Sequence, residues 1–407
     1  MSSTIELKQL SSLNIVSPKG FKAAGLHAGI KHKKKDLAIL VSEVPASVAG
    51  VFTTNAVQAA PLKVTKEVVY NTQKMQAIIV NSGNANACTG KQGLADAYEM
   101  QALAAEKLGI EPYLVGVAST GVIGEIMNMA PIQSGVQKLV PAKTLESAID
   151  FSQAIMTTDT VMKNTTYATV IDGVEVIISG TAKGSGMIEP NMATMLGFIA
   201  TDANIASSDL QQALSSITDK TFNSITVDGD TSTNDTVLVL ANGLAGNKPL
   251  TPAHPEWNTF YTALQYVAED LAKAIARDGE GATKLIEVEV EGAISDEEAR
   301  KVAKTIVGSP LVKTAVFGND ANWGRIIAAI GYSGCTIDPD KITIQIGGNT
   351  MVEFGEPIKF SEETLIEVLK QTDVKISVSL GVGEGHGLAW GCDLTYDYVQ
   401  INASYRS

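Results

Sequence analysis

The sequence predicts an α+β fold, a layered α/β sandwich in which helices cover sheets. Residues 168–170 and 174–178 are strand-prone runs joined by Asp172 and Gly173. An Asp-Gly pair between such runs is a strong hairpin signal, because both turn positions favour positive φ. Apolar residues recur every three or four positions from Trp257 to Ile275, which indicates a long amphipathic helix. Strands and helices do not follow the strict order of βαβ units, and this favours α+β over a purely parallel sheet.

The remaining strands are expected where short apolar runs stand between turn-forming residues. Residues 285–291 alternate apolar residues with glutamate, so one face of this strand is expected to pack and the other to meet water. The other strands are predicted at residues 37–41, 77–80, 114–118, 195–200, 342–346 and 374–380.

Further helices follow from the same apolar spacing. Ala97, Met100, Ala104 and Leu108 form a second stripe, which Gly109 ends. Other helices are predicted at residues 145–156, 208–219, 296–307 and 361–371, and the long helix is expected to end near residue 279. Neither an internal repeat of 20–50 residues nor a low-complexity linker divides the chain.

Composition narrows the class of protein. The 407 residues are 45% hydrophobic, and their formal net charge is −13. An acidic surface repels phosphates, so nucleic acid is a poor partner. The isolated Cys88, Cys335 and Cys392 form neither a zinc motif nor a disulfide framework. The apolar runs are too short for a membrane span, and the N-terminus lacks the apolar core of a signal peptide. We therefore expect a cytoplasmic protein with no membrane partner.

Several patterns that resemble functional motifs have simpler explanations. Lys31, Lys33, Lys34 and Lys35 are expected to form a solvated turn rather than a phosphate site. The glycine-rich stretch 381–387 departs from GxGxxG because position 386 is histidine, so it gives weak support for a nucleotide loop. No GxSxG elbow accompanies the four histidines, and structural roles for them are favoured over a Ser-His-Asp triad.

A hydroxyl can also be activated without histidine. A threonine that becomes a chain N-terminus carries its own base, because an α-amine has an unperturbed pKa of about 7.7–8.0. Thr194 is a candidate, since it follows the small Ala193 and directly precedes the predicted strand 195–200. The same pattern also fits an ordinary loop that enters a strand.

Two loops at strand ends could complete a site. Residues 119–124, STGVIG, follow the strand 114–118. There the Thr120 hydroxyl and the Gly121 N–H could point to one place and form an oxyanion hole, or the segment could be a plain turn. Residues 81–86, NSGNAN, follow the strand 77–80, and their amides either line a pocket or close a loop.

Taken in order, these motifs resemble the ornithine acetyltransferase family, the bifunctional glutamate N-acetyltransferases and amino-acid acetyltransferases of arginine biosynthesis. The resemblance covers nearly the whole chain, and ATML at 193–196 is its most diagnostic part. The other matching motifs are GFKAAGLHAG at 20–29, VFTTN at 51–55, NSGNAN, STGVIG, MTTDT at 156–160, KGSGMI at 183–188, DGDTSTND at 228–235, GNDANWGR at 318–325 and NASYRS at 402–407. Any one of them is weak alone, but the ordered set is specific.

The resemblance implies an activity and its residues. Acetyl would pass from N2-acetyl-L-ornithine to L-glutamate through an acetyl group on Thr194, after the precursor cuts itself between Ala193 and Thr194. The products would be an alpha chain, residues 1–193, and a beta chain, residues 194–407, assembled as an α2β2 heterotetramer. Thr120 and Gly121 would form the oxyanion hole. The implied substrate contacts are Thr157, Lys183, Thr194, Glu280, Asn402 and Ser407.

One implied contact departs from the family pattern, and another has two candidate threonines. Ser407 stands where many relatives have threonine, which keeps the hydroxyl. Thr157 and Thr158 are adjacent, and only the resemblance favours Thr157. The implied fold is that of the self-cleaving aminopeptidases, and no metal or cofactor is implied. Acetyl-CoA as a second acetyl donor is left undecided. A self-processing amidase or aminopeptidase and a non-enzymatic binding protein with an uncut loop are the rival interpretations.

Overall fold

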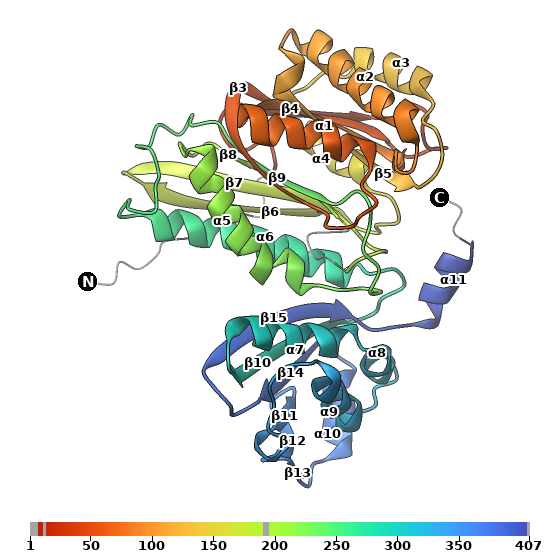
Figure 1. Cartoon of the computed structure of the whole chain (residues 1–407), viewed down its shortest axis with the longest axis vertical. Coiled ribbons are helices and arrows are strands. Elements are labelled where there is room, and N and C mark those ends of the chain that lie inside the picture. Colours follow the sequence, from red (N-terminus) through yellow and green to blue (C-terminus); the bar gives the residue numbers. More distant parts are fainter. Residues whose placement is uncertain (1–6, 11–13, 190–194, 405–407) are drawn as a thin grey trace.

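The computed structural model describes residues 7–10, 14–189 and 195–404, which form two units, each built on one β-sheet (Figure 1). The larger unit has a nine-stranded sheet in the order β1-β6-β7-β8-β9-β3-β4-β5, with β2 paired to β3. The smaller unit has a six-stranded sheet in the order β13-β12-β11-β14-β10-β15. Mixed sheets covered by helices confirm the predicted α+β class.

The larger unit takes up the first two thirds of the chain. Its strands are β1 (Lys8–Gln9), β2 (Phe21–Leu26), β3 (Leu37–Phe52), β4 (Lys74–Asn84), β5 (Val115–Val122), β6 (Lys163–Ile171), β7 (Val174–Lys183), β8 (Leu196–Thr201) and β9 (Thr236–Ala241). Its α-helices are α1 (Ala60–Glu67), α2 (Gly90–Leu108), α3 (Met129–Lys138), α4 (Leu145–Ile155), α5 (Ser207–Lys220) and α6 (Trp257–Arg277). Short turns of other helix types are η1 (Val68–Thr72), η2 (Pro112–Leu114) and η3 (Phe222–Ser224).

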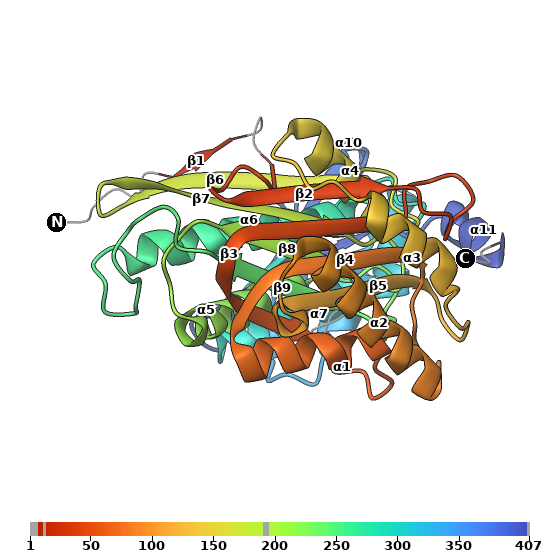
Figure 2. The same cartoon turned by 90° about the horizontal axis from the view of Figure 1, so that it is seen from above.

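Strand β3 is bent and belongs to two halves of the large sheet, one formed with β2, β4 and β5 and the other with β6–β9. Its pairing with β4 is irregular between Val41 and Ala46; the first half pairs with β2 and β4, whereas residues 47–52 pair with β9. Apolar side chains of the two halves, such as Leu40 and Phe198, share one buried core with the inner face of α4. Helices α1–α3 cover the β3–β5 half, and α5 and α6 cover the β6–β9 half (Figures 1 and 2). The result is a helix–sheet–sheet–helix sandwich.

The two local signals that predicted the fold are confirmed. Strands β6 and β7 form a hairpin closed by Ile171 opposite Val174, and the turn residues Asp172 and Gly173 have φ values of 51° and 77°. The long predicted helix is α6, and its apolar stripe is buried against the sheet.

The smaller unit is a sheet covered on one face by helices. Its strands are β10 (Leu285–Ala293), β11 (Thr343–Ile346), β12 (Asn349–Glu353), β13 (Glu356–Pro357), β14 (Asp373–Ser379) and β15 (Gly385–Cys392). Its helices are α7 (Asp296–Gly308), α8 (Pro310–Phe317), α9 (Trp323–Tyr332), η4 (Pro339–Lys341) and α10 (Glu362–Leu369), and the final helix α11 (Tyr396–Ser404) follows β15. The alternation predicted for residues 285–291 is confirmed, because Ile286, Val288 and Val290 lie in the core. Among helices of the described residues, none has both the length and the apolar character needed to cross a membrane.

Candidate active site

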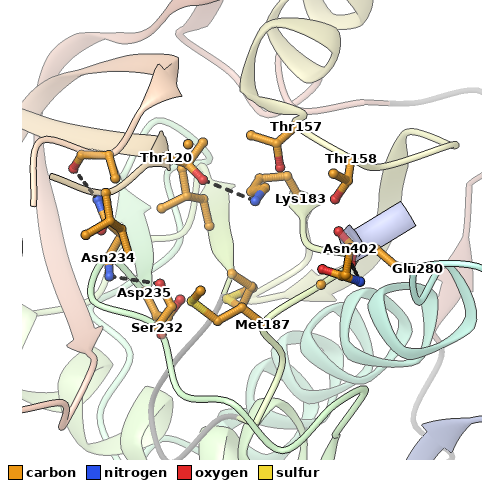
Figure 3. A pocket seen from close by; sticks show the side chains of 16 residues that line it. Thr120, Thr157, Thr158, Lys183, Met187, Ser232, Asn234, Asp235, Glu280 and Asn402 are labelled. Atoms are coloured by element: carbon orange, nitrogen blue, oxygen red, sulfur yellow. Dashed lines mark hydrogen bonds between the residues drawn. The ribbon is translucent and has the colours of Figure 1, made fainter. Parts of the chain in front are cut away.

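A pocket lies where the ends of β5 and β7 meet the start of β8, the turn after α6 and helix α11 (Figure 3). Residues that the sequence placed in a site line this pocket together: Thr120, Gly121, Thr157, Lys183, Glu280 and Asn402. Ala193, Thr194 and Ser407 lie outside the described residues. Met195 and Leu196, which directly follow Thr194 in the sequence, also line the pocket.

The loop of Thr120 and Gly121 is held by tight packing of two strand ends. Strands β4 and β5 are parallel, with Gly83 opposite Gly121. Gly121 has a φ of 133°, and a Cβ atom there would lie 2.3 Å from the carbonyl carbon of Gly83. Only glycine fits this position without strain. The Thr120 hydroxyl oxygen accepts a hydrogen bond from Lys183 Nζ at 3.1 Å, so its own proton is not used in that bond.

Lys183 is a buried cation at the end of β7. Its side chain points toward Thr120 and Thr157 (Figure 3). Burial lowers the pKa of Lys183, while the nearby carboxylates of Asp159, Asp235 and Glu280 act in the opposite direction. An ammonium group that has lost most of its water is well placed to bind an anionic group of a small molecule.

Glu280 supplies a carboxylate on another side of the pocket. It is 8% exposed, and Asn402 Nδ2 of α11 donates to its Oε2 at 2.8 Å. The Glu280 N–H donates to the Ser185 carbonyl at 3.0 Å. A Cβ atom at Gly186 would lie 2.3 Å from the Glu280 carboxyl carbon, so the turn after β7 packs directly on this side chain. Together these contacts hold an acceptor for a cationic group.

A buried ion network beneath the pocket joins three of its segments. Lys163, whose side chain is fully buried, donates to Asp159 at 2.7 Å and to Asp278 at 2.6 Å. Asp159 also accepts from the backbone N–H groups of Thr157, at 3.0 Å, and Gly184, at 2.7 Å. The network therefore fixes the loop of Thr157, the turn after Lys183 and the turn before Glu280 with respect to one another.

The charge balance within this network favours the ionised carboxylate of Asp159. Burial alone would raise the pKa of Asp159, but the ammonium groups of Lys183 and Lys163 and the Gly184 N–H lower it to about 2.

Sequence reasoning missed one wall of the pocket. Ser232, Asn234 and Asp235 line it and belong to the motif at 228–235, which the family resemblance included without a role. Asn234 Nδ2 donates to the carbonyls of Ala85, at 2.6 Å, and Ser119, at 2.8 Å. The available signal in the sequence was the polar run at 228–235, which directly precedes the apolar residues of β9. All six residues of β9 are buried. Both Thr157 and Thr158 line the pocket, so this geometry does not choose between them.

Other sequence expectations have mixed outcomes. The side-chain amides of residues 81–86 hold backbone of this loop and of its neighbours. Asn81 Nδ2 donates to the Asn84 carbonyl at 2.9 Å, Asn84 Nδ2 to the Glu125 carbonyl at 3.1 Å, and Asn86 Nδ2 to the Gly93 carbonyl at 2.8 Å. Lys33 and Lys34 are exposed, as expected for a solvated turn. For Lys31 the predicted solvated turn is wrong. Its Nζ donates to the Met156 carbonyl at 2.8 Å, and burial lowers its pKa to about 8.

The described part of the chain offers one cluster with metal-ligand spacing, Asp172, His254 and Glu256. These groups are already bonded to each other: His254 Nε2 lies 3.3 Å from Asp172 Oδ2, and the Glu256 N–H donates to His254 Nδ1 at 3.1 Å. None of them lines the pocket. We therefore interpret the cluster as a set of hydrogen bonds that holds the turn of the β6–β7 hairpin against the segment before α6.

Fold and pocket together define an enzyme of the layered α+β class that acts on a small molecule. The ArgJ family model matches residues 22–407. The chain is 59% identical over 404 residues to the arginine biosynthesis bifunctional protein ArgJ of Geobacillus kaustophilus, covering 99% of this chain and 98% of the relative. It is 60% identical over 405 residues to that of Halalkalibacterium halodurans, with the same coverage.

A crystal structure of an arginine biosynthesis bifunctional protein from Bacillus halodurans is also similar. It is 65% identical with a TM-score of 0.52, and the match covers 52% of this chain and all of that one. The chain therefore belongs to the ArgJ family, which confirms the resemblance drawn from its motifs. The expected enzyme class, an acyltransferase, is confirmed with it.

Proposed function

We propose that this enzyme transfers the acetyl group of N2-acetyl-L-ornithine to L-glutamate through an acetyl group carried on Thr194. One observation carries the proposal. A single pocket brings together Lys183, Glu280 and the loop of Thr120 and Gly121, and its wall includes Met195, the residue after Thr194. The naming of the relatives as proteins of arginine biosynthesis supports this substrate class.

The charges of the pocket match those of the substrates. The Lys183 ammonium pairs with the α-carboxylate, and Glu280, held by Asn402, pairs with the side-chain ammonium of the donor. The Thr120 hydroxyl and the Gly121 N–H receive the negative charge that develops on the acetyl oxygen. Removal of one such donor typically costs about 3 kcal/mol, roughly a 100-fold loss of rate.

Maturation precedes catalysis in this proposal. The Thr194 hydroxyl attacks the Ala193 carbonyl, the peptide bond becomes an ester, and water hydrolyses it to give residues 1–193 and 194–407. The freed α-amine then serves as the base for the hydroxyl. The crystallised relative supports two chains, since its whole length matches only 52% of this chain, close to the share that residues 194–407 make up.

Intact mass spectrometry tests both steps. We expect two masses that divide at Ala193 and Thr194, and an added acetyl group on the second chain after incubation with N2-acetyl-L-ornithine. Thr194→Ala should remain one chain of 407 residues. Thr218→Ala, a buried threonine of α5 outside the pocket, is the matched control and should be processed normally. Processing of Thr194→Ala would contradict the proposal.

A self-processing amidase would use water in place of glutamate as the acetyl acceptor. Release of ornithine should therefore depend on glutamate, and initial-rate plots should run parallel, as a covalent intermediate requires. Ornithine release at an equal rate without glutamate would favour the amidase.

We also propose acetyl-CoA as a second acetyl donor and an α2β2 assembly. The description of the relatives as bifunctional supports a second activity. Transfer of labelled acetyl from acetyl-CoA to glutamate tests the first point, and native mass spectrometry tests the second. Absence of transfer, or a native mass of one 1–193 and one 194–407 chain, would contradict the respective statement.

A further inference from the structure

Asp235 is a buried carboxyl group with no role in the proposed reaction as described above. Asp235 is 3% exposed, yet it lines the pocket, and among the described residues its Oδ2 atom has no hydrogen-bond partner. The carboxylate accepts hydrogen bonds from the Met195 N–H and the Ser232 side chain. A buried polar atom without a partner costs free energy, so a group that is retained in this state within a pocket points to a ligand.

Asp235 lies next to Met195, where strands β8 and β9 begin. Strands β8 and β9 run parallel with Leu196 opposite Thr236, and the Thr236 N–H donates to the Met195 carbonyl at 3.0 Å. Asp235 immediately precedes Thr236, and Met195 immediately follows Thr194. Figure 3 shows Asp235 on a different side of the pocket from Glu280 and Asn402, which bind the far end of the donor in the proposed function.

The proposed reaction also requires one proton to be added to the ornithine α-amine and one to be removed from the glutamate ammonium. The Thr194 α-amine passes the hydroxyl proton to the leaving nitrogen, so ornithine departs with a neutral α-amine and must gain a proton to become an ammonium. Glutamate arrives as an ammonium and must lose one before its nitrogen can attack. A group that gives a proton in the first half-reaction and takes one in the second would serve both amines.

We propose that Asp235 is this catalytic residue and holds the proton that the two amines exchange. This inference rests on the proposed function. In the first half-reaction the protonated Asp235 carboxyl gives its proton to the α-amine of ornithine, which leaves as ammonium. In the second half-reaction the Asp235 carboxylate takes a proton from the glutamate ammonium, whose nitrogen then attacks the acetyl ester. Each turnover returns Asp235 to its protonated form, and protons balance.

The surroundings of Asp235 suit a proton carrier. Burial raises the pKa of Asp235 well above its ordinary value, while the Lys183 ammonium opposes the rise. Lys183 in turn faces Asp159, Lys163 and Glu280, so Asp235 lies at the edge of a shared set of charges. A carboxyl with an ordinary pKa would be a poor proton donor near neutral pH, and a raised pKa brings it closer to the working range.

The test compares two acceptors on Asp235→Asn in its cleaved form. The protein is first acetylated with N2-acetyl-L-ornithine, and loss of the acetyl group from the 194–407 chain is followed by mass spectrometry. Glutamate should remove it about 100-fold more slowly than in the natural enzyme, the typical lower range for loss of a general acid or base. Hydroxylamine, which is uncharged at neutral pH, should remove it at a nearly unchanged rate.

Asp96→Asn is the matched control. Asp96 is 2% exposed and, within the part of the chain that the structure describes, its Oδ2 atom also has no hydrogen-bond partner, but it lies on α2 outside the pocket. Its substitution should leave both acceptor rates within about twofold, while general damage to the fold would slow both. Equal slowing of glutamate and hydroxylamine by Asp235→Asn would overturn the proposal. Failure of the natural enzyme to form an acetyl chain would instead overturn the proposed function.

A second measurement needs no variant, in case Asp235→Asn does not fold or is not cleaved. In the natural enzyme the ratio of the rates of acetyl removal by glutamate and by hydroxylamine should stay nearly constant from about pH 7 to 8, because the Thr194 α-amine serves both acceptors and Asp235 takes the glutamate proton inside the pocket. A ratio that rises about tenfold per pH unit, as the free amine of glutamate becomes more abundant in solution, would overturn the proposal.

Discussion

At the scale of single residues, Lys183 combines a position in the pocket wall with an environment that disfavours its charge. It is 7% exposed and donates to Thr120. Burial disfavours its charge, so a bound carboxylate would restore part of the interaction that water no longer provides. The charge of Lys183 is therefore expected to matter more for binding than for the stability of the fold.

Lys183→Met should weaken donor binding. A hydrogen bond to a charged group is worth about 1.5–3 kcal/mol, so kcat/KM for N2-acetyl-L-ornithine should fall roughly 10- to 100-fold. Steady-state kinetics measure this loss. Lys66→Met, a lysine that lies over the Phe52 ring away from the pocket, is the control and should retain activity. An unchanged kcat/KM in Lys183→Met would contradict the assigned role.

Asp159 should make stability depend on pH in the acid range. Its folded pKa of about 2 lies below the unfolded value of about 3.9. The stabilisation is therefore complete above about pH 4 and is lost as pH falls through 2. Asp159→Asn should lower the free energy of unfolding by about 3–5 kcal/mol at pH 7, because it breaks a buried ion pair.

Urea unfolding of Asp159→Asn and the natural protein at several pH values provides the measurement. The gap between the two should be constant from pH 7 to about 4 and should narrow toward pH 2. Asp150→Asn, which removes the partly exposed ion pair with Lys35, should cost at most about 1 kcal/mol. A gap that widens on acidification would refute the assignment.

At the scale of secondary-structure elements, the packed ends of β4 and β5 hold the loop of Thr120 and Gly121, the proposed oxyanion hole. Gly121 has a positive φ and packs against the Gly83 backbone. Gly124, three residues later, also has a positive φ of 86° but has open space around the Cβ position. Substitutions at these two glycines therefore distinguish the effect of backbone strain, which both share, from the effect of close packing, which only Gly121 has.

Gly121→Ala should reduce activity much more than Gly124→Ala. Both substitutions strain the backbone by about 1 kcal/mol, but only the first forces the strand ends apart. Thermal unfolding and acetyl transfer measure the two effects. We expect Gly121→Ala to lose at least about tenfold in kcat and Gly124→Ala to stay close to the natural enzyme. Equal activity of both variants would disprove the packing argument.

Elements with a regular apolar period were predictable from the sequence, and others were not. The β6–β7 hairpin and α6 were found because their signals are local. Strand β3 was predicted to end at residue 41, yet it continues to Phe52 because its second half pairs with β9, far along the chain. Helices α8 and α9 were missed; α8 contains two valines and a phenylalanine, residue types that also suit strands.

The candidate site was predictable only in part for a related reason. Thr120, Lys183 and Glu280 came from a family resemblance, whereas composition and spacing left each of their motifs ambiguous. The pairing of Lys163 with Asp278 spans 115 residues, so no local pattern announces it. Asp235 shows the same limit, because burial and an unpartnered oxygen are properties of the folded chain.

At the scale of the whole molecule, α11 connects the smaller unit to the pocket. It follows the last strand of the smaller unit and supplies Asn402, while Tyr398 donates to Asp228 at 3.3 Å. Yet α11 has no buried residue. Its contribution is therefore expected to be to ligand binding rather than to the core.

Deletion of residues 396–407 should preserve the fold and impair catalysis. We expect the melting temperature to change by only a few degrees, since little apolar area is lost. The loss of Asn402 should reduce kcat/KM about tenfold or more, because Glu280 loses a hydrogen bond. Calorimetry and kinetics measure these changes, with Asn402→Ala as the control. Unfolding of the shortened chain would show that α11 is a structural element.

The strand order has a consequence for the lifetime of the enzyme. Strands β8 and β9 lie between β7 and β3 in the sheet, so a cut after Ala193 would leave two strands of the second fragment inserted between strands of the first. Neither fragment could be exchanged without opening the ladder on both sides. The two fragments of one mature molecule should therefore stay together for its lifetime, and damage to either fragment would inactivate the whole molecule.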